Sequence, residues 1–181
     1  MLAVLASGSG TILEAMLAAG VSVGVVVADR PCRALEVAAD ACLDAYLVAR
    51  HSFGSDFDRG GYTQELVASL ADRGVDVVAM AGFMTVLAGP MFERYDGRVL
   101  NTHPSLLPAF PGAHAVRDAL AFGVKITGCT VHLATVRMDD GPILAQEAVP
   151  VHADDTEVTL HERIKAVERA LYPRVVREFL S

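Results

Sequence analysis

The stretch Asn101-Thr102-His103-Pro104-Ser105-Leu106-Leu107-Pro108 decides what this sequence predicts. It follows a short apolar run at 98–100, which predicts the end of a strand. In an extended chain alternate side chains point to the same face, so Asn101 and His103 lie together. Pro104 keeps the backbone at His103 extended and ends the strand. The stretch therefore predicts an amide and an imidazole side by side at the carboxyl end of a strand, where open α/β sheets bind ligands.

These two side chains suit acid–base and oxyanion chemistry. Histidine gains and loses a proton near neutral pH, and an amide can donate a hydrogen bond to a developing oxyanion. The spacing alone leaves a second interpretation open, in which Asn101 and His103 only satisfy nearby backbone groups at a strand end.

The composition predicts one globular domain that spans residues 1–181. Hydrophobic residues make up 52% of the 181 residues and charged residues 20%, which excludes a disordered chain. The net charge of −7 argues against nucleic acid or an anionic membrane as the main partner. Three cysteines are too few for a disulfide framework, and neither a signal peptide nor a membrane span is expected. We therefore expect a protein of the reducing cytoplasm.

Strands and helices alternate along the chain. Several valine-rich runs are apolar throughout, which is typical of strands buried on both faces of a parallel sheet. Strands are expected at 2–6, 21–28, 45–48, 75–80, before Asn101, and at 126–134 and 142–149. Helices are expected at 12–19, 33–41, 62–71, within 82–94, at 113–122, and from 156 onward with a kink or break at Pro173. This order predicts an α/β fold with a single doubly wound, mostly parallel, Rossmann-like sheet and helices on both faces.

The first expected strand opens into Ser7-Gly8-Ser9-Gly10-Thr11, which resembles a phosphate-binding loop. Glycines allow a ligand to approach the backbone, and a helix start offers unpaired N–H groups. A plain structural turn is the main alternative. A dinucleotide site is disfavoured because Leu13 replaces the third glycine of that fingerprint, although Asp29 mimics the carboxylate that binds a ribose.

A second candidate cluster is His132 with Asp139. If the strand at 126–134 lies beside the one that ends at Asn101, Asp139 returns to the same sheet edge. A carboxylate there would favour the imidazolium form of His103. Alternatively, Asp139 is a solvated turn residue and His132 a core histidine with satisfied hydrogen bonds. A zinc or iron site at His103, His132 and Asp139 has only weak support, because close ligand spacing is missing.

Taken together, the motifs resemble the phosphoribosylglycinamide formyltransferase family of folate-dependent enzymes. The Asn-x-His-Pro-Ser-Leu-Leu-Pro segment is specific to folate-type formyltransferases, including those that act on methionyl-tRNA and the formyltetrahydrofolate deformylases. The matching pieces follow the family order and span nearly the whole chain: Ser7–Gly10, Ala81–Met84, Asn101–Pro108, Val131-His132, Met138–Pro142, Glu168 and Leu171–Pro173.

The resemblance implies a set of site residues. Catalysis falls to Asn101, His103 and Asp139, with His132 supporting them. The phosphate and glycinamide parts of the substrate fall to Gly8, Ser9, Gly10, Thr11, Ile12 and Glu168. The residues that the resemblance implies for folate binding are Arg59, Met84, Thr85, Val86, Leu87, Asn101, Thr135, Val136, Arg137, Met138 and Asp139.

By the same resemblance, the expected reaction moves a formyl group from 10-formyltetrahydrofolate, a cosubstrate, to the amine of glycinamide ribonucleotide in purine synthesis, without a metal. The partners are then small molecules, not nucleic acid or membrane, and the protein is a monomer or a homodimer. The alternatives are hydrolysis of the formyl folate, as in a deformylase, and a non-catalytic nucleotide-binding module.

Three positions depart from the family pattern. Thr11-Ile12 replaces the usual Ser-Asn, so position 12 offers only its backbone N–H. Thr85 replaces a common arginine. Asp140 replaces a common glycine and adds a charge beside Asp139.

Overall fold

The computed structural model describes residues 1–52 and 54–181, and the described residues form seven strands and six helices. The strands are β1 (Leu2–Ala6), β2 (Val25–Ala28), β3 (Asp44–Leu47), β4 (Val77–Met80), β5 (Val99–His103), β6 (Ile126–Leu133) and β7 (Ile143–Pro150). The helices are α1 (Thr11–Ala18), α2 (Arg33–Asp40), α3 (Arg59–Ala71), α4 (Gly89–Arg94), α5 (Ala115–Phe122) and α6 (Glu157–Leu180).

The strands belong to a sheet with the order β3-β2-β1-β4-β5-β6-β7. β1, β2, β3 and β4 pair in parallel, whereas β6 and β7 form an antiparallel pair. The order reverses direction after β3, which is the arrangement of a doubly wound sheet. The predicted fold class, a mostly parallel Rossmann-like sheet, is confirmed.

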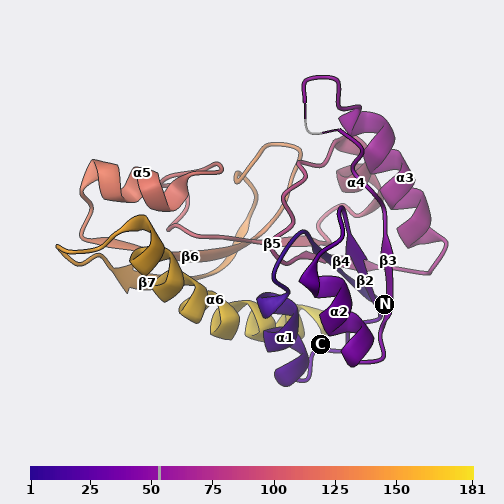
Figure 1. The fold of residues 1–181 in the computed structure, drawn as a ribbon, viewed down its shortest axis with the longest axis horizontal. Coiled ribbons are helices and arrows are strands. Elements are labelled where there is room, and N and C mark those ends of the chain that lie inside the picture. Colours follow the sequence, from indigo (N-terminus) through magenta and orange to yellow (C-terminus); the bar gives the residue numbers. More distant parts are fainter. Residues whose placement is uncertain (53) are drawn as a thin grey trace. The chain divides into compact units, whose positions relative to one another are not determined.

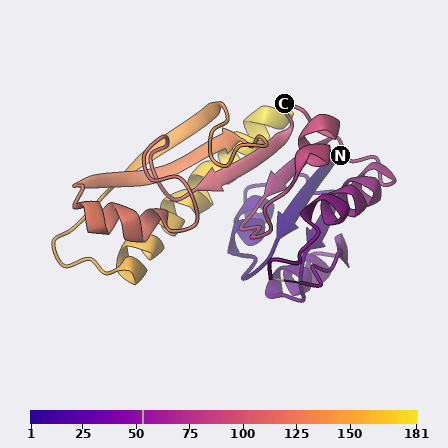
Figure 2. The same cartoon turned by 90° about the horizontal axis from the view of Figure 1, so that it is seen from above.

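The first of two compact units comprises Met1–Leu100. The strands β1 and β2 are buried along their whole length, as their continuous apolar sequence predicts. Right-handed crossovers place α1 and α2 on one face of β1 to β4 and α3 on the other (Figures 1 and 2). Side chains from both helical layers complete the core of this unit, among them Leu13, Met16, Leu66, Leu70 and Met91.

The second unit comprises Asn101–Ser181. Its long helix α6 contacts β6, β7 and α5. Thr156 caps α6 through a reciprocal pair of hydrogen bonds with Thr159, which satisfies donors at the helix start. The apolar face of α6 buries Leu160, Ile164 and Leu171.

Two elements begin three or more residues away from the predicted start. β2 begins at Val25, not at residue 21, because the N–H of Val21 donates to the carbonyl of Met16 and residues 21–24 return from α1. α3 begins at Arg59, not at residue 62, because the Asp58 side chain accepts a hydrogen bond from the N–H of Gly61. This cap compensates for the low helix propensity of two consecutive glycines.

The helix α6 continues through Pro173, so a break at this position is wrong. Proline removes one backbone donor from a helix interior. Here Leu171, Tyr172 and Pro173 itself are buried, and this packing outweighs the lost hydrogen bond. Within the described residues, no helix combines the length and apolar character required to cross a bilayer.

Candidate active site

The candidate active site begins with the last residues of β5. His103 is buried at the end of the strand, and Pro104 follows it. The Nε2 of His103 lies 2.9 Å from the carbonyl oxygen of Phe110, so this nitrogen carries a proton and donates it. Phe110 has a positive φ of 53°, a conformation that a bulky residue rarely adopts. The loop after β5 is therefore shaped so that a backbone carbonyl meets the imidazole.

Asp139 faces the other side of the same imidazole. Its Oδ2 lies 3.4 Å from the Nδ1 of His103 and accepts a hydrogen bond of 2.7 Å from the N–H of Gly112. Both side chains are 7% exposed. The two ring nitrogens of His103 thus each face an oxygen atom, one of the Phe110 carbonyl and one of the Asp139 carboxylate.

The turn between β6 and β7 brings Asp139 to this position. Asp139 itself has a φ of 55°, which aspartate tolerates better than most residues. Gly141 packs so closely that a Cβ atom would lie 1.8 Å from the carbonyl oxygen of Leu133. Only glycine therefore allows the turn to fold back against the end of β6.

His132 supports Asn101. The Nδ1 of His132 lies 3.1 Å from the carbonyl oxygen of Leu133 and donates to it, so Nε2 accepts a hydrogen bond from the Nδ2 of Asn101 at 3.2 Å. Burial lowers the pKa of His132, in keeping with a neutral ring. A bulge between Val131 and His132 interrupts the pairing with β7 and sets the direction of this side chain. His132 therefore fixes which way the Asn101 amide points.

The structure brings Asn101, His103, His132 and Asp139 together within the second unit. The Nε2 of His132 also lies 3.7 Å from the Oδ1 of Asp139. The metal interpretation of these residues gains no support, because the described part of the chain contains no group of three or more His, Cys, Asp or Glu suited to a metal ion. The arrangement is instead a hydrogen-bonded acid–base cluster.

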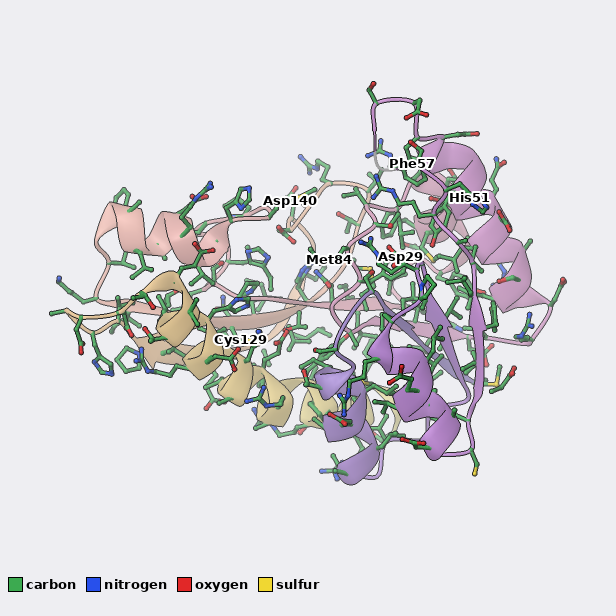
Figure 3. The ribbon with its side chains drawn as sticks, viewed as in Figure 1. Asp29, His51, Phe57, Met84, Cys129 and Asp140 are labelled. Atoms are coloured by element: carbon green, nitrogen blue, oxygen red, sulfur yellow. The ribbon has the colours of Figure 1, made fainter. Side chains whose placement is uncertain are left out.

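Glu168 of α6 lies beside Thr102, whose side chain points to the opposite face of β5 from Asn101 and His103. Thr102 and Glu168 form a hydrogen bond, and the Oγ1 of Thr102 also lies 3.2 Å from the Sγ of Cys129. Burial raises the pKa of Glu168, and the bond from Thr102 opposes that effect. Cys129, labelled in Figure 3, has its pKa raised to about 12 by burial, so it remains a thiol.

The glycine-rich loop belongs to the first unit and leads from β1 into α1. Gly10 has a φ of 72° and is the N-cap of α1, where it has no side chain to occupy the first N–H groups. A Cβ atom on Gly10 would lie 2.9 Å from the Cα of Ala34. The N–H of Ala34 donates to the carbonyl of Gly8, and Arg33 donates to the carbonyl of Ser9. The start of α2 therefore fixes the backbone of this loop.

Ile12 belongs to α1, and its side chain is buried with only 7% exposed. The side chain at this position therefore contributes to the core of the first unit. Only the backbone N–H of Ile12 remains for a ligand, beside the hydroxyls of Ser9 and Thr11, which lie 3.4 Å apart. The departure from the family pattern at position 12 therefore has a consequence for packing.

Ile12→Asn should lower the free energy of unfolding by about 3 kcal/mol, because it removes buried apolar surface and adds an amide without partners. Thermal unfolding followed by circular dichroism measures the loss. The matched control Ile12→Val should lose about 1 kcal/mol. Equal stability of the asparagine variant and the unchanged chain would contradict the placement of this side chain in the core.

The predicted folate residues divide into buried and exposed groups. Thr85 and Leu87 are buried in the first unit, whereas Met84 and Val86 between them expose 65% and 44% of their surface. In the second unit, Val136 and Met138 are exposed, and Arg137 pairs with Asp140 at 2.9 Å. Asp140 is labelled in Figure 3. Arg59 is exposed at the start of α3.

The sequence did not reveal two contributors, the carbonyl of Phe110 and the N–H of Gly112. Both act through backbone atoms that every residue carries. Pro104 indicated where the strand ends, but not which backbone groups of the following loop would meet a side chain. The ribose interpretation of Asp29 is not supported, since its carboxylate already accepts hydrogen bonds from Arg30 and Thr85.

Comparison with known proteins agrees with this geometry. Residues 1–176 match the family model described as formyl transferase. A curated phosphoribosylglycinamide formyltransferase from Mycobacterium tuberculosis (strain CDC 1551 / Oshkosh) is 49% identical, over 94% of this chain and 80% of that protein. One from Bacillus subtilis (strain 168) is 34% identical, over 99% of this chain and 94% of that protein.

Solved structures show the same likeness. The crystal structure of glycinamide ribonucleotide transformylase 1 from Symbiobacterium toebii has a TM-score of 0.91 and 43% identity, covering 98% of this chain and 86% of that one. Sequence and fold therefore agree along almost the whole chain, and the chain belongs to the formyl transferase family.

Proposed function

We propose that this chain transfers the formyl group of 10-formyltetrahydrofolate to the amine of glycinamide ribonucleotide, a step of purine biosynthesis. Relatives at 49% and 34% identity that align over most of both chains carry the name phosphoribosylglycinamide formyltransferase. The observation that supports the chemistry best is the contact between His103 and Asp139, with Asn101 held beside them by His132. Because the family model covers residues 1–176, we propose that residues 1–181 act as one formyltransferase domain.

The reaction needs a group that stabilises negative charge on oxygen. When the amine attacks the formyl carbon, a tetrahedral intermediate forms and its oxygen becomes an oxyanion. The Nδ2 of Asn101 carries a second N–H bond besides the one directed at His132, and it can donate this bond to the oxyanion. Protonated His103 supplies positive charge, which Asp139 stabilises at the ring's other side.

His103 can use Nε2 for this purpose only if the bond to the Phe110 carbonyl gives way. The substrate oxygen would then replace that carbonyl as the acceptor. Collapse of the intermediate breaks the bond from the formyl carbon to the folate nitrogen and leaves the new bond to the glycinamide nitrogen. One proton leaves the attacking amine and one reaches the folate nitrogen, carried by His103 or by a bound water.

We assign the folate to exposed apolar side chains and the phosphate to the glycine-rich loop. In the first unit, we propose Met84 and Val86 as folate contacts, because exposed apolar side chains suit a flat pterin. In the second unit, taken by itself, we propose the same role for the exposed side chains of Val136 and Met138. Arg59, Thr135 and Arg137 remain proposed contacts, and Thr85 and Leu87 would contribute through their backbones. The N–H groups at the start of α1 suit a phosphate.

The initial rate of formyl donor consumption, followed by absorbance at increasing glycinamide ribonucleotide, tests this proposal. A rate that is near zero without the amine and saturates with it supports formyl transfer. An equal rate without the amine would indicate a deformylase. Donor binding without turnover would indicate a non-catalytic module.

Glu168 is the residue we assign to the glycinamide end of the substrate. Glu168→Gln should raise the KM for glycinamide ribonucleotide about tenfold, because a hydrogen bond to a charged group is replaced by a neutral one. The KM for the formyl donor should not change. Steady-state kinetics with each substrate varied in turn measures both values.

The pH dependence sharpens this prediction. Burial raises the pKa of Glu168, so its carboxylate takes up a proton at a higher pH than an ordinary glutamate. The KM for glycinamide ribonucleotide should therefore rise as the pH falls toward that raised value, and it should stay flat in Glu168→Gln. Glu162→Gln, an exposed change on the same helix, is the control. A flat profile in the unchanged chain would contradict the role of Glu168.

A further inference from the structure

The carboxylate of Asp29 is fully buried immediately after β2 in the first unit. Arg30 donates two hydrogen bonds to it, from Nε to Oδ1 and from Nη2 to Oδ2, both at 2.9 Å. The hydroxyl of Thr85 donates a third at 2.6 Å, and the nearby hydroxyl of Ser7 helps to lower the pKa of the carboxyl group. Burying a carboxylate costs desolvation free energy, which its hydrogen-bond donors must offset. A role that depends on this arrangement of donors would account for that cost.

Ser7 extends the network to the backbone of the segment after β4. Its Oγ accepts a hydrogen bond of 2.8 Å from the N–H of Met84, and its own N–H donates to the carbonyl of Gly82 at 3.2 Å. Ser7 is therefore close to Asp29 and is bonded to the backbone N–H of Met84. Asp29 therefore fixes residues 82–85 at several points, through Ser7 and directly through Thr85.

This anchoring sets which side chains of the segment are exposed. Thr85 is turned inward and is 3% exposed, whereas its neighbours Met84 and Val86 are 65% and 44% exposed. Figure 3 labels Asp29 and Met84, the two ends of the connection through Ser7. Because the side chain of Thr85 is bonded to the buried carboxylate of Asp29, the apolar side chains of Met84 and Val86 on either side of it face outward.

We infer that Asp29 is a positioning residue, which through Thr85 and Ser7 holds Met84 and Val86 in the conformation that binds the formyl folate. This inference rests on the proposed function, since it assumes that residues 84–87 bind the formyl folate. It gives the buried hydroxyl of Thr85 a role. The threonine hydroxyl is a donor short enough to reach Asp29 inside the unit, and Arg30 supplies the positive charge.

The charge state of Asp29 agrees with this role. Burial alone would raise its pKa, but the hydrogen bonds from Arg30, Thr85 and Ser7, with the positive charge of Arg30, lower it below the usual value. The carboxylate is therefore ionised at neutral pH and acts only as an acceptor. All of its donors remain oriented toward it under the conditions of the reaction.

Thr85→Val tests the inference with the smallest change in shape. It should raise the KM for the formyl donor about tenfold, because a buried carboxylate loses a donor and the segment loosens. The KM for glycinamide ribonucleotide and kcat should change less than about threefold, a split that general destabilisation would not produce. Thr85→Ser, which keeps the hydroxyl, should restore the donor KM.

Thr127→Val is the matched control. Thr127 is also buried, but its hydroxyl has no hydrogen-bond partner among the described residues, so this change should leave the donor KM unaltered. The inference would be overturned if the unchanged chain transfers formyl groups and Thr85→Val has the same KM for the formyl donor.

Hydrogen exchange measured by mass spectrometry gives a second readout that does not require turnover. The peptide that covers 82–88 should exchange faster in Asp29→Asn and in Thr85→Val than in the unchanged chain, while the peptide that covers β6 should not. Faster exchange supports the anchoring even if no formyl transfer is observed, a result that would refute the proposed function alone. Unchanged exchange in both variants would overturn the role of Asp29.

Discussion

Replacing His103 with alanine should reduce kcat for formyl transfer by about 10³-fold, since a group that moves protons and one that stabilises an oxyanion are each worth about 10²–10⁴. The imidazole lies between the Phe110 carbonyl and Asp139, and alanine cannot replace either contact. The KM for both substrates should change little, because the loss falls on the transition state. Stopped or continuous absorbance assays of donor consumption measure kcat directly.

His152→Ala is the control for this change, because His152 is exposed in the turn before α6. It should retain the rate of the unchanged chain. Circular dichroism and thermal unfolding should show that His103→Ala is folded. A folded His103→Ala variant with a rate within about threefold of the unchanged chain would remove His103 from the mechanism.

Asp139→Asn should reduce kcat by about 10²-fold or more, because the neutral amide no longer stabilises an imidazolium. The amide oxygen can still accept the hydrogen bond from Gly112, so the turn should keep its shape. The neutral amide oxygen then takes the place of Oδ2 beside the Nδ1 of His103, and the amide nitrogen takes the place of Oδ1, which lies 3.7 Å from the Nε2 of His132. Transfer should fail for lack of positive charge at the ring.

The neighbouring Asp140 gives a closely matched control. It is exposed and pairs with Arg137 on the surface, where an ion pair contributes little. Asp140→Asn should therefore leave kcat within about twofold of the unchanged chain. Comparable losses from Asp139→Asn and Asp140→Asn would show that the charge of the turn matters in general, and not the contact with His103.

Local sequence was enough to predict the placement of Asn101 and His103. A strand alternates its side chains and a proline ends it, so both residues had to share the face at the end of β5. The same local reasoning predicted the glycine-rich start of α1 and the valine-rich parallel strands. These features depend on residues that are adjacent in the sequence, and the pattern of polar and apolar residues reveals such local relations.

Asp139 could be suspected from sequence but not placed. Its position depends on a turn with φ of 55° and on Gly141, which folds the chain against Leu133. The direction of the His132 side chain depends on a bulge in β6 where it pairs with β7. The alternation of side chains along a regular strand does not predict such a bulge. The family resemblance, not the spacing, singled these residues out.

The side chains of Ile12 and Asp29 illustrate a different limit. From sequence, Ile12 was a departure from a binding pattern, and the structure shows a core side chain of α1. The position of Asp29 in the sequence resembled that of a carboxylate that binds a ribose. In the structure, this carboxylate instead accepts hydrogen bonds from Arg30 and Thr85 inside the first unit. Asp29 and Thr85 are 56 residues apart in the sequence. Whether a polar side chain faces a ligand or the interior therefore depends on partners that local sequence does not reveal.

The destination of the formyl carbon tests the central claim most directly. The chain would be supplied with 10-formyltetrahydrofolate labelled with ¹³C in the formyl group, together with glycinamide ribonucleotide, and the products identified by mass spectrometry and NMR. The account predicts that the label lost from the donor appears on the glycinamide nitrogen, and that His103→Ala slows its appearance. Label recovered as free formate, at the same rate with or without the amine, would contradict it.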